Sequence, residues 1–230
     1  MNATKRALIV RGGWEGHEPV AATDLFIPHL ESSGYDVRIE DRPAVYADAE
    51  LMASIDLVVQ CMTMSTIEKD EVAGLRAAVR AGTGLAGWHG GIADSYRESA
   101  DYLQLIGGQF ACHPGKEPSL RAGGPSDNFI PHRLDIVRPD HPVTAGIESF
   151  DLVTEQYWVL SDAYNEVLAT TTLAAQSWNE WTRPVTSPAV WTRQWGSGRV
   201  FVATPGHSLH VLQVPQVRTI VERGLLWASR

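Results

Sequence analysis

The sequence of 230 residues has little cysteine: Cys61 and Cys112 stand in different contexts and form no CxxC pair. A disulfide framework is therefore not expected, and such sparse cysteine is typical of a cytosolic chain. The segment from Met1 to Arg6 is polar and runs straight into a short apolar stretch, so it lacks a signal-peptide core. No apolar run reaches the length of a membrane span. These absences predict a cytoplasmic protein with no membrane partner.

Positive charge is also scarce. Lys and Arg number 19 against 27 Asp and Glu, which gives a formal net charge of -8, and no run of Lys or Arg occurs. Proteins that bind nucleic acids usually carry a basic patch or stripe, so no nucleic-acid partner is expected. An acidic surface disfavours polyanions and favours a neutral small molecule as the substrate.

Compact phosphate and metal motifs are missing as well. No GxGxxG or P-loop pattern is complete, and neither HExxH nor paired cysteines occur. His207 and His210 are three residues apart, but Pro205-Gly206 argues against a helix there. Histidines from distant loops can still converge. Zinc or another divalent metal, held by His17, His89 and His207 with a water, therefore stays open as an alternative cofactor.

What is present fits one domain spanning residues 1–230. Hydrophobic residues make up 44% of the chain, enough for a sizeable core. The first half alternates short apolar stretches with amphipathic ones, a βαβ pattern. Strands are expected at 7–10, 35–41, 55–62 and 85–88. A helix is expected over 19–33 with a kink at Pro28, a second helix after a capping box formed by Ser65 and Glu68, and a third over 99–106. This order predicts an α/β fold with a mainly parallel central sheet and helices on both faces.

The second half is less regular. Residues 110–131 are rich in Gly, Pro and Ser and are expected to form a long surface excursion. Strands are expected at 133–137 and 167–171, followed by a hairpin over 189–204 that turns at Gly196-Ser197-Gly198. A last helix is expected to begin at Pro215.

Three histidines are expected just after strands, where ligands bind in open parallel sheets. They are His17, His89 and His207. The segment Gly87-Trp88-His89-Gly90-Gly91 has the G-x-H-x-G spacing of a nucleophile elbow, with histidine in the place of the nucleophile. An imidazole at that point transfers protons, polarises an oxygen or binds a metal.

Other side chains are candidates for the same edge. His113 lies in the long excursion and can fold over it, and Glu155 stands beside aromatic residues, as an acid, base or ligand would. Of the eight tryptophans, Trp14 and Trp88 are best placed to stack on a sugar ring. A structural role is expected for the remaining histidines and for the Cys61 thiol; these histidines are His29, His132, His141 and His210.

Seven segments in this order resemble the ThuA-like (trehalose utilisation) family over nearly the whole chain. They are Trp14-Glu15-Gly16-His17-Glu18, residues 84–91, Gly107-Gly108-Gln109-Phe110 with His113-Pro114, residues 140–144, Glu155 with Tyr157, Gly198-Arg199-Val200-Phe201 leading to Gly206-His207, and residues 224–228. The resemblance implies a flavodoxin-like sheet related to class I glutamine amidotransferases and a role in bacterial sugar catabolism. Carried over residue by residue, it implies functional roles for His17, His89, His113, Glu155 and His207, with Tyr157 beside the substrate.

One departure from the amidotransferase pattern decides against that activity. Position 89 is histidine and not cysteine, so thiolate attack on glutamine is not available there. The expected function is instead that of an enzyme acting on a keto-sugar or keto-glycoside, for example by 3-keto/2-keto isomerisation. His89 and His207 would do the proton and oxyanion work, with Glu155 or His17 as the other partner.

Two alternatives stay open. The first is a metal-dependent hydrolase of a glycoside or ester, in which a water held by the histidines attacks. The second is a sugar-sensing or partner-binding module that kept the scaffold without the chemistry. A symmetric homodimer is the expected assembly.

Overall fold

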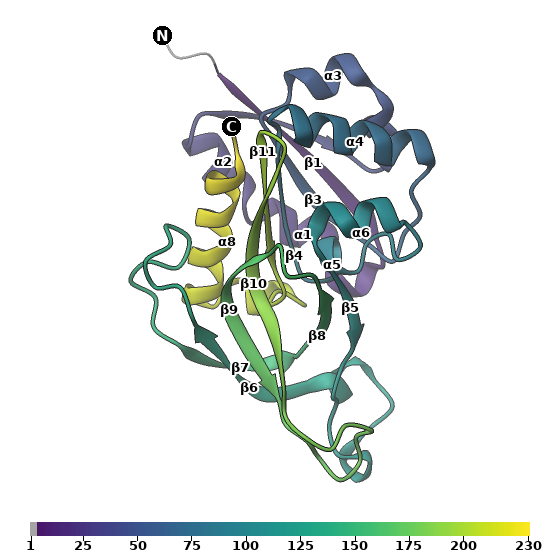
Figure 1. The fold of residues 1–230 in the computed structure, drawn as a ribbon, viewed down its shortest axis with the longest axis vertical. Helices are drawn as coiled ribbons and strands as arrows, with labels where there is room; N and C mark the ends of the chain where they lie inside the picture. Colours follow the sequence, from purple (N-terminus) through teal and green to yellow (C-terminus); the bar gives the residue numbers. More distant parts are fainter. Residues whose placement is uncertain (1–3) are drawn as a thin grey trace.

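The structure is a computed structural model that describes residues 4–230; the first three residues of the polar N-terminal segment lie outside it. Its centre is a nine-stranded sheet with the order β2-β1-β3-β4-β11-β10-β9-β6-β7 (Figure 1). The strands are β1 (Lys5–Gly13), β2 (Tyr35–Glu40), β3 (Leu57–Thr63), β4 (Gly84–Trp88), β6 (Phe129–Ile136), β7 (Phe150–Glu155), β9 (Glu166–Leu173), β10 (Val185–Trp195) and β11 (Gly198–Ala203). A separate pair joins β5 (Gly108–Cys112) to β8 (Trp158–Ser161).

The sheet has a parallel half and an antiparallel half. Strands β2, β1, β3, β4 and β11 are parallel, as the βαβ pattern predicts. Strands β10, β9, β6 and β7 extend it with antiparallel pairs. Every residue of β3 is buried, which agrees with its continuous apolar sequence and its central place. The expectation of an α/β sheet is confirmed, but the parallel strands make up only about half of it.

Helices cover both faces of the parallel half, because successive residues of each strand point to opposite sides. In β1, Ala7 and Ile9 pack toward one face, and Leu8 and Val10 toward the other. The first face carries α1 (Pro19–Asp24), α2 (Ile27–Ser32) and α8 (Pro215–Ala228). The second carries α3 (Ala49–Ser54), α4 (Lys69–Ala81), α5 (Gly90–Ala93) and α6 (Ala100–Ile106). Two apolar cores therefore hold the sheet between them.

Local details depart from the sequence expectations at two helices. The helix expected over 19–33 is interrupted between Asp24 and Ile27, so Pro28 lies in the first turn of α2, where a missing N–H costs nothing. The capping box lies three residues later than expected. Glu68, and not Ser65, is the N-cap of α4, and the Glu71 carboxylate accepts the Glu68 backbone N–H at 2.7 Å.

The antiparallel half holds most of the unpredicted structure. The excursion expected over 110–131 contains the end of β5, two short 3₁₀ helices and the start of β6; the 3₁₀ helices are Pro118–Leu120 and Pro125–Asn128. Strands β7 and β8 were not predicted, and they flank the residues at 156 and 157. Their chain direction brings Glu155, the last residue of β7, back toward the parallel half.

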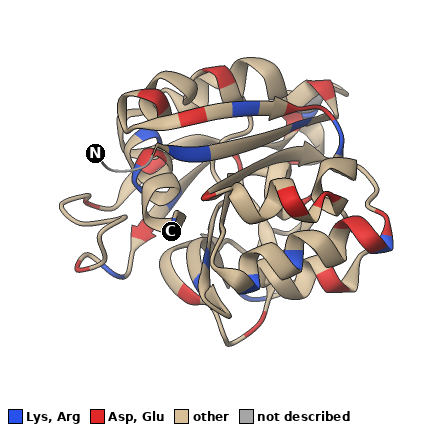
Figure 2. Cartoon of the chain, turned by 90° about the horizontal axis from the view of Figure 1, so that it is seen from above, with Lys and Arg blue, Asp and Glu red and all other residues tan. Residues whose placement is uncertain are grey.

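Charged residues are dispersed over the described surface. In Figure 2 the Lys and Arg ribbons alternate with those of Asp and Glu and form no continuous basic stripe. Among residues 4–230, no helix combines the length and apolar character that a membrane span requires.

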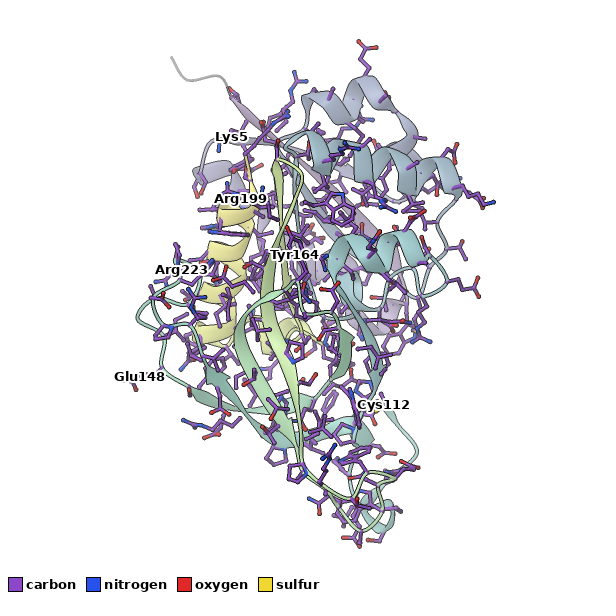
Figure 3. The ribbon with its side chains drawn as sticks, viewed as in Figure 1. Lys5, Cys112, Glu148, Tyr164, Arg199 and Arg223 are labelled. Atoms are coloured by element: carbon purple, nitrogen blue, oxygen red, sulfur yellow. The ribbon has the colours of Figure 1, made fainter. Side chains whose placement is uncertain are left out.

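The two thiols differ in their surroundings, which gives a first prediction. Cys61 is buried in β3, and burial raises the pKa of its thiol to about 12. Cys112 is only half-buried, at the end of β5 (Figure 3). Since the thiolate is the reactive form, a disulfide reagent at pH 8 should titrate one thiol in the folded chain and two in denaturant. Cys112→Ser should abolish the native reaction, while Cys61→Ser should leave it unchanged; the reverse pattern would contradict this assignment.

Candidate active site

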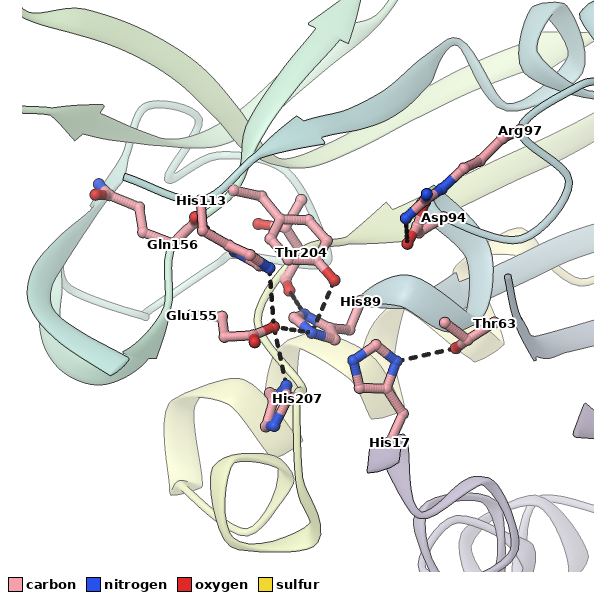
Figure 4. A network of polar contacts seen from close by, with 11 residues as sticks. His17, Thr63, His89, Asp94, Arg97, His113, Glu155, Gln156, Thr204 and His207 are labelled. Atoms are coloured by element: carbon pink, nitrogen blue, oxygen red, sulfur yellow. Dashed lines mark hydrogen bonds and ion pairs between the residues drawn. The ribbon is translucent and has the colours of Figure 1, made fainter. Parts of the chain in front are cut away.

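Four histidines and a glutamate meet at the carboxyl ends of the parallel strands (Figure 4). They come from five separate places in the chain: His17 from the 3₁₀ helix Glu15–His17 after β1, His89 after β4, His113 after β5, Glu155 from the end of β7 and His207 after β11. The structure therefore brings together all the titratable candidates that the sequence suggested.

His89 occupies a sharp strand-to-helix turn between β4 and α5. Its φ of 49° and ψ of -142° are sparsely populated by residues other than glycine. The backbone N–H of His89 donates to the Ala203 carbonyl of β11 at 2.7 Å, which anchors the turn to the neighbouring strand. This is the geometry that the G-x-H-x-G spacing predicts for an elbow, with an imidazole raised above the sheet edge.

The glycines after His89 are required by close packing. A Cβ atom at Gly90 would lie 2.5 Å from the Cε1 atom of His17. A Cβ atom at Gly91 would lie 2.9 Å from the Cα atom of Cys61 in β3. Gly90 thus leaves room for the His17 ring beside His89, and the two ring centroids are 4.6 Å apart.

Glu155 lies at the centre of the cluster. Its Oε2 atom is 3.0 Å from Nε2 of His89, 2.9 Å from Nδ1 of His207 and 3.5 Å from Nε2 of His113. The side chains of Glu155 and His89 are 5% and 2% exposed. One buried carboxylate oxygen therefore faces three imidazole nitrogens that come from three different loops.

Backbone carbonyls fix which nitrogen of two rings carries hydrogen. Nδ1 of His89 is 2.7 Å from the carbonyl oxygen of Thr204, and Nδ1 of His113 is 3.4 Å from that of Gln156. A carbonyl only accepts, so both Nδ1 atoms donate. In the neutral rings the Nε2 atoms then present lone pairs, and both point toward the carboxylate of Glu155 (Figure 4).

The remaining two histidines are held differently. Nδ1 of His17 lies 3.0 Å from Oγ1 of Thr63, a residue at the end of β3, while the ring packs edge-on against His207 at 5.0 Å. Nδ1 of His207 is near Glu155 in distance, but the angle is outside hydrogen-bonding geometry. Among the described residues, this buried nitrogen has no hydrogen-bond partner.

Burial sets the charge state of the cluster. It lowers the pKa of His17 to about 2 and lowers the pKa values of His89 and His113 below their ordinary range. Burial by itself would raise the pKa of Glu155, but the contacts with His207 and His89 outweigh it and hold that pKa well below its usual value. At neutral pH the site therefore combines an ionised carboxylate with neutral imidazoles at His17, His89 and His113.

Tyr157 completes the polar contacts of His89. Its hydroxyl is 2.8 Å from Nε2 of His89, and burial raises the pKa of the phenol well above its usual value, so the hydroxyl stays protonated. Phe110 packs against Tyr157 and His113, at centroid distances of 4.4 and 4.6 Å. Tyr157, expected beside the substrate, is 2% exposed and contacts His89 through its hydroxyl.

Aromatic rings form the rim of the site. Trp14 is 40% exposed and stands edge-on to His17 at 4.7 Å. Phe129 packs against His207 at 4.9 Å from the other side. The expectation for Trp88 was wrong: it is 2% exposed and packs on Phe26 at 4.8 Å in the core. Side chains alternate along a strand, so Trp88 points into the core while the turn raises His89.

Several site residues went unpredicted, namely Thr63, Phe129, Gln156 and Thr204. Thr63 ends a predicted strand, so the rule that found His89 applies to it equally. Phe129 lies at the start of β6, before the strand predicted over 133–137, and Gln156 follows β7, which was not predicted. A groove of about 350 Å³ is lined in part by Gln156, the neighbour of Glu155 in the sequence, and by Trp178.

The cluster also has the composition of a metal centre. One ligand atom from each of four residues lies within 4.8 Å of every other. The four residues are His17, His89, Glu155 and His207, all buried. Three of them were proposed from the sequence as metal ligands; Glu155 is the addition.

Comparisons with known proteins agree with this fold. The ThuA family model, described as trehalose utilisation, matches residues 6–228. A ThuA-like protein from Bacteroides uniformis superposes with a TM-score of 0.72 and 19% identity, covering 98% of this chain and 91% of that one. A cytoplasmic protein from Salmonella typhimurium LT2 has a TM-score of 0.63 and 15% identity, covering 98% of this chain and all (100%) of the other.

A more distant likeness is to a β-galactosidase from Bacillus circulans sp. alkalophilus, with a TM-score of 0.55 and 10% identity. It covers 98% of this chain but 30% of the β-galactosidase. At such identities these structures show a shared fold alone. No curated protein matched the chain.

The low pKa of buried His17 predicts an acid-sensitive fold. Unfolded His17 takes up a proton near pH 6.5, whereas the folded residue does so only near 2, so the unfolded state binds more protons between these values. The free energy of unfolding of the chelator-treated protein should therefore fall as the pH is lowered from 6.5 to 5. His17→Gln should remove up to about 1.4 kcal/mol per pH unit of this slope. Urea titrations at several pH values measure it; an unchanged slope, or an equal change in His210→Gln, would contradict the prediction.

Proposed function

We propose that this chain, which belongs to the ThuA (trehalose utilisation) family, is an enzyme acting on a keto-sugar or keto-glycoside. The observation that carries the proposal is the buried carboxylate of Glu155, whose Oε2 atom lies within 3.5 Å of three imidazole nitrogens. A binding module has no need of such a cluster, because several buried titratable groups are costly unless they serve chemistry.

The proposed reaction is an isomerisation between 3-keto and 2-keto forms. A keto group acidifies the neighbouring C–H bond, and a carboxylate or imidazole can remove that proton. Glu155 is ionised and His89 presents a lone pair, so both can accept it. The proposal assigns stabilisation of the enediolate oxygen to His207, and return of the proton to the other carbon completes the reaction.

Aromatic residues support a carbohydrate as the substrate. Trp14 offers an exposed ring at the rim, and sugars present apolar C–H faces that stack on such rings. The groove that Trp178 lines has room for a second ring beside the reacting one. This arrangement favours a keto-glycoside over a free keto-sugar.

We also propose kinship with the flavodoxin-like scaffold of class I glutamine amidotransferases. The support is the elbow at His89, which occupies the place of a nucleophile at a strand-to-helix turn. Position 89 has no thiol, so the chain lacks the nucleophile that attack on glutamine requires there. The expected cytoplasmic location, the homodimer and the carbohydrate partner are part of the same proposal.

A second candidate is a metal-dependent hydrolase of a glycoside or related ester. The observation that favours it is the close approach of four ligand atoms in the cluster. A metal-activated water would then attack the bond that links the two halves of the substrate. The products of the two reactions can be distinguished by isotope labelling, because only the isomerisation breaks a C–H bond.

Turnover of a 3-keto-glycoside in heavy water separates the candidates. Isomerisation should give a 2-keto product that carries deuterium at the carbon that regains hydrogen, as seen by NMR or mass spectrometry. Glu155→Gln and the double variant His89→Gln/His207→Gln should each lower kcat by roughly 10²- to 10⁴-fold. The matched control His210→Gln, at an exposed position of the neighbouring short helix Leu209–Leu212, should keep full activity. Release of free sugar without deuterium would favour the hydrolase, and full activity in the double variant would refute the isomerase mechanism.

The rim tryptophan should affect binding more than chemistry. Trp14→Ala removes a stacking surface without touching Glu155, so KM should rise by about 10-fold or more, in line with roughly 1–2 kcal/mol of lost contact, while kcat changes little. Trp14→Phe should recover most of the loss. Steady-state kinetics test this, and a fall in kcat with unchanged KM would show that Trp14 serves the reacting groups instead.

A further inference from the structure

We infer that His17, His89, Glu155 and His207 bind a divalent first-row transition-metal ion of the zinc or cobalt type. One ligand atom from each lies within 4.8 Å of the others, and all four side chains are buried. The inference deepens the proposed function and rests on it only for the use that the ion would serve. Its support comes from the arrangement of acceptors, from an unsatisfied nitrogen and from the partners of the ligands.

The first argument is that ring nitrogens converge on one carboxylate oxygen. Nδ1 of His89 contacts the Thr204 carbonyl, so Nε2, 3.0 Å from Oε2 of Glu155, is the ring atom that faces the cluster. Nε2 of His113 lies 3.5 Å from the same oxygen, and its Nδ1 contacts the Gln156 carbonyl. A cation among these atoms would be attracted by the carboxylate and by the lone pairs of the facing nitrogens.

The second argument is the unsatisfied nitrogen of His207. Nδ1 is buried and, among residues 4–230, has no hydrogen-bond partner, although the Glu155 oxygen is 2.9 Å away. Buried polar atoms without partners are rare in native proteins and mark a missing ligand, water or ion. A cation bound in the plane of the ring would satisfy both this nitrogen and the carboxylate.

The third argument is how the ligands are oriented. Metal-binding histidines usually hold their other ring nitrogen on a carbonyl, carboxylate or hydroxyl, which fixes the tautomer. His89 does so through Thr204 at 2.7 Å and His17 through Thr63 at 3.0 Å. In Figure 4, the second ring nitrogen of His17 faces the cluster while the first contacts Thr63. The chain thus fixes the orientation of both rings through the nitrogen that faces away from the cluster, as a metal site requires.

The donor set indicates the class of metal. Three imidazoles and one carboxylate suit zinc, cobalt, nickel or iron, whereas magnesium and calcium prefer oxygen ligands alone. A bound divalent ion would supply positive charge for a developing enediolate oxygen. With His89 and Glu155 engaged as its ligands, the substrate proton would pass to His113, which lies 3.5 Å from Glu155 and outside the ligand set.

Cobalt(II) is the probe for the test, because its visible absorption reports coordination directly. The full chain, dialysed against a chelator and then freed of it, should take up one Co²⁺ per chain with a visible d–d band, and its melting temperature should rise. Zn²⁺ should displace the cobalt. His207→Ala and Glu155→Gln should each weaken Co²⁺ binding at least 100-fold, and Thr63→Val, which removes only the partner of His17, by roughly 10- to 100-fold.

The control is His210→Ala, which removes an exposed histidine three residues from His207 and should bind Co²⁺ like the natural chain. Circular dichroism of each metal-free variant shows that it is folded, and Glu155→Gln, which preserves shape, keeps the test valid if His207→Ala unfolds. Binding by the natural chain no tighter than by His207→Ala or Glu155→Gln would overturn the inference. The measurement uses no substrate: tight cobalt binding without turnover would refute the proposed enzyme alone, and turnover without cobalt binding would refute the metal site alone.

Discussion

The buried carboxylate of Glu155 is the interaction on which the rest of the site depends. An ionised group in apolar surroundings must be compensated, and here the compensating groups arrive from loops after β1, β4, β5 and β11. Glu155 itself comes from the antiparallel half of the sheet. The two halves are therefore joined at the point where the chemistry is proposed, and a change in either would leave a charge without its partners.

The elbow at His89 is the second constraint. A residue with positive φ at the end of a parallel strand costs free energy, on the order of 1–3 kcal/mol, and persists only where its surroundings hold it. Here the Ala203 carbonyl holds the backbone and the Thr204 carbonyl holds the ring. Gly90 keeps the space beside it open for His17. The strain is thus located at the residue that the proposed reaction uses.

Most of the parallel half was predictable because its strands and longer helices each carry their own signal, although the short helix α3 was not predicted. The apolar run that became β3 and the stripe of α4 are local patterns, and the order of the elements leaves few topologies. The antiparallel half gave weaker signals, so β7 and β8 were missed and the parallel share of the sheet was overestimated. Trp88 was misplaced for a related reason: residues adjacent in sequence point to opposite sides, and composition does not say which side is the core.

The sequence by itself determined which groups are available: the histidines after the strand ends, the glycines that permit the elbow, and the absence of a thiol at position 89. Tertiary structure alone decided that Glu155 lies among the imidazoles, which nitrogen of His89 carries hydrogen, and that Nδ1 of His207 lacks a partner within residues 4–230. The physical reason is that strand position follows from local hydrophobic pattern, whereas the meeting of side chains far apart in the sequence, such as His89 and Glu155 at a separation of 66 residues, depends on the packing of the whole sheet.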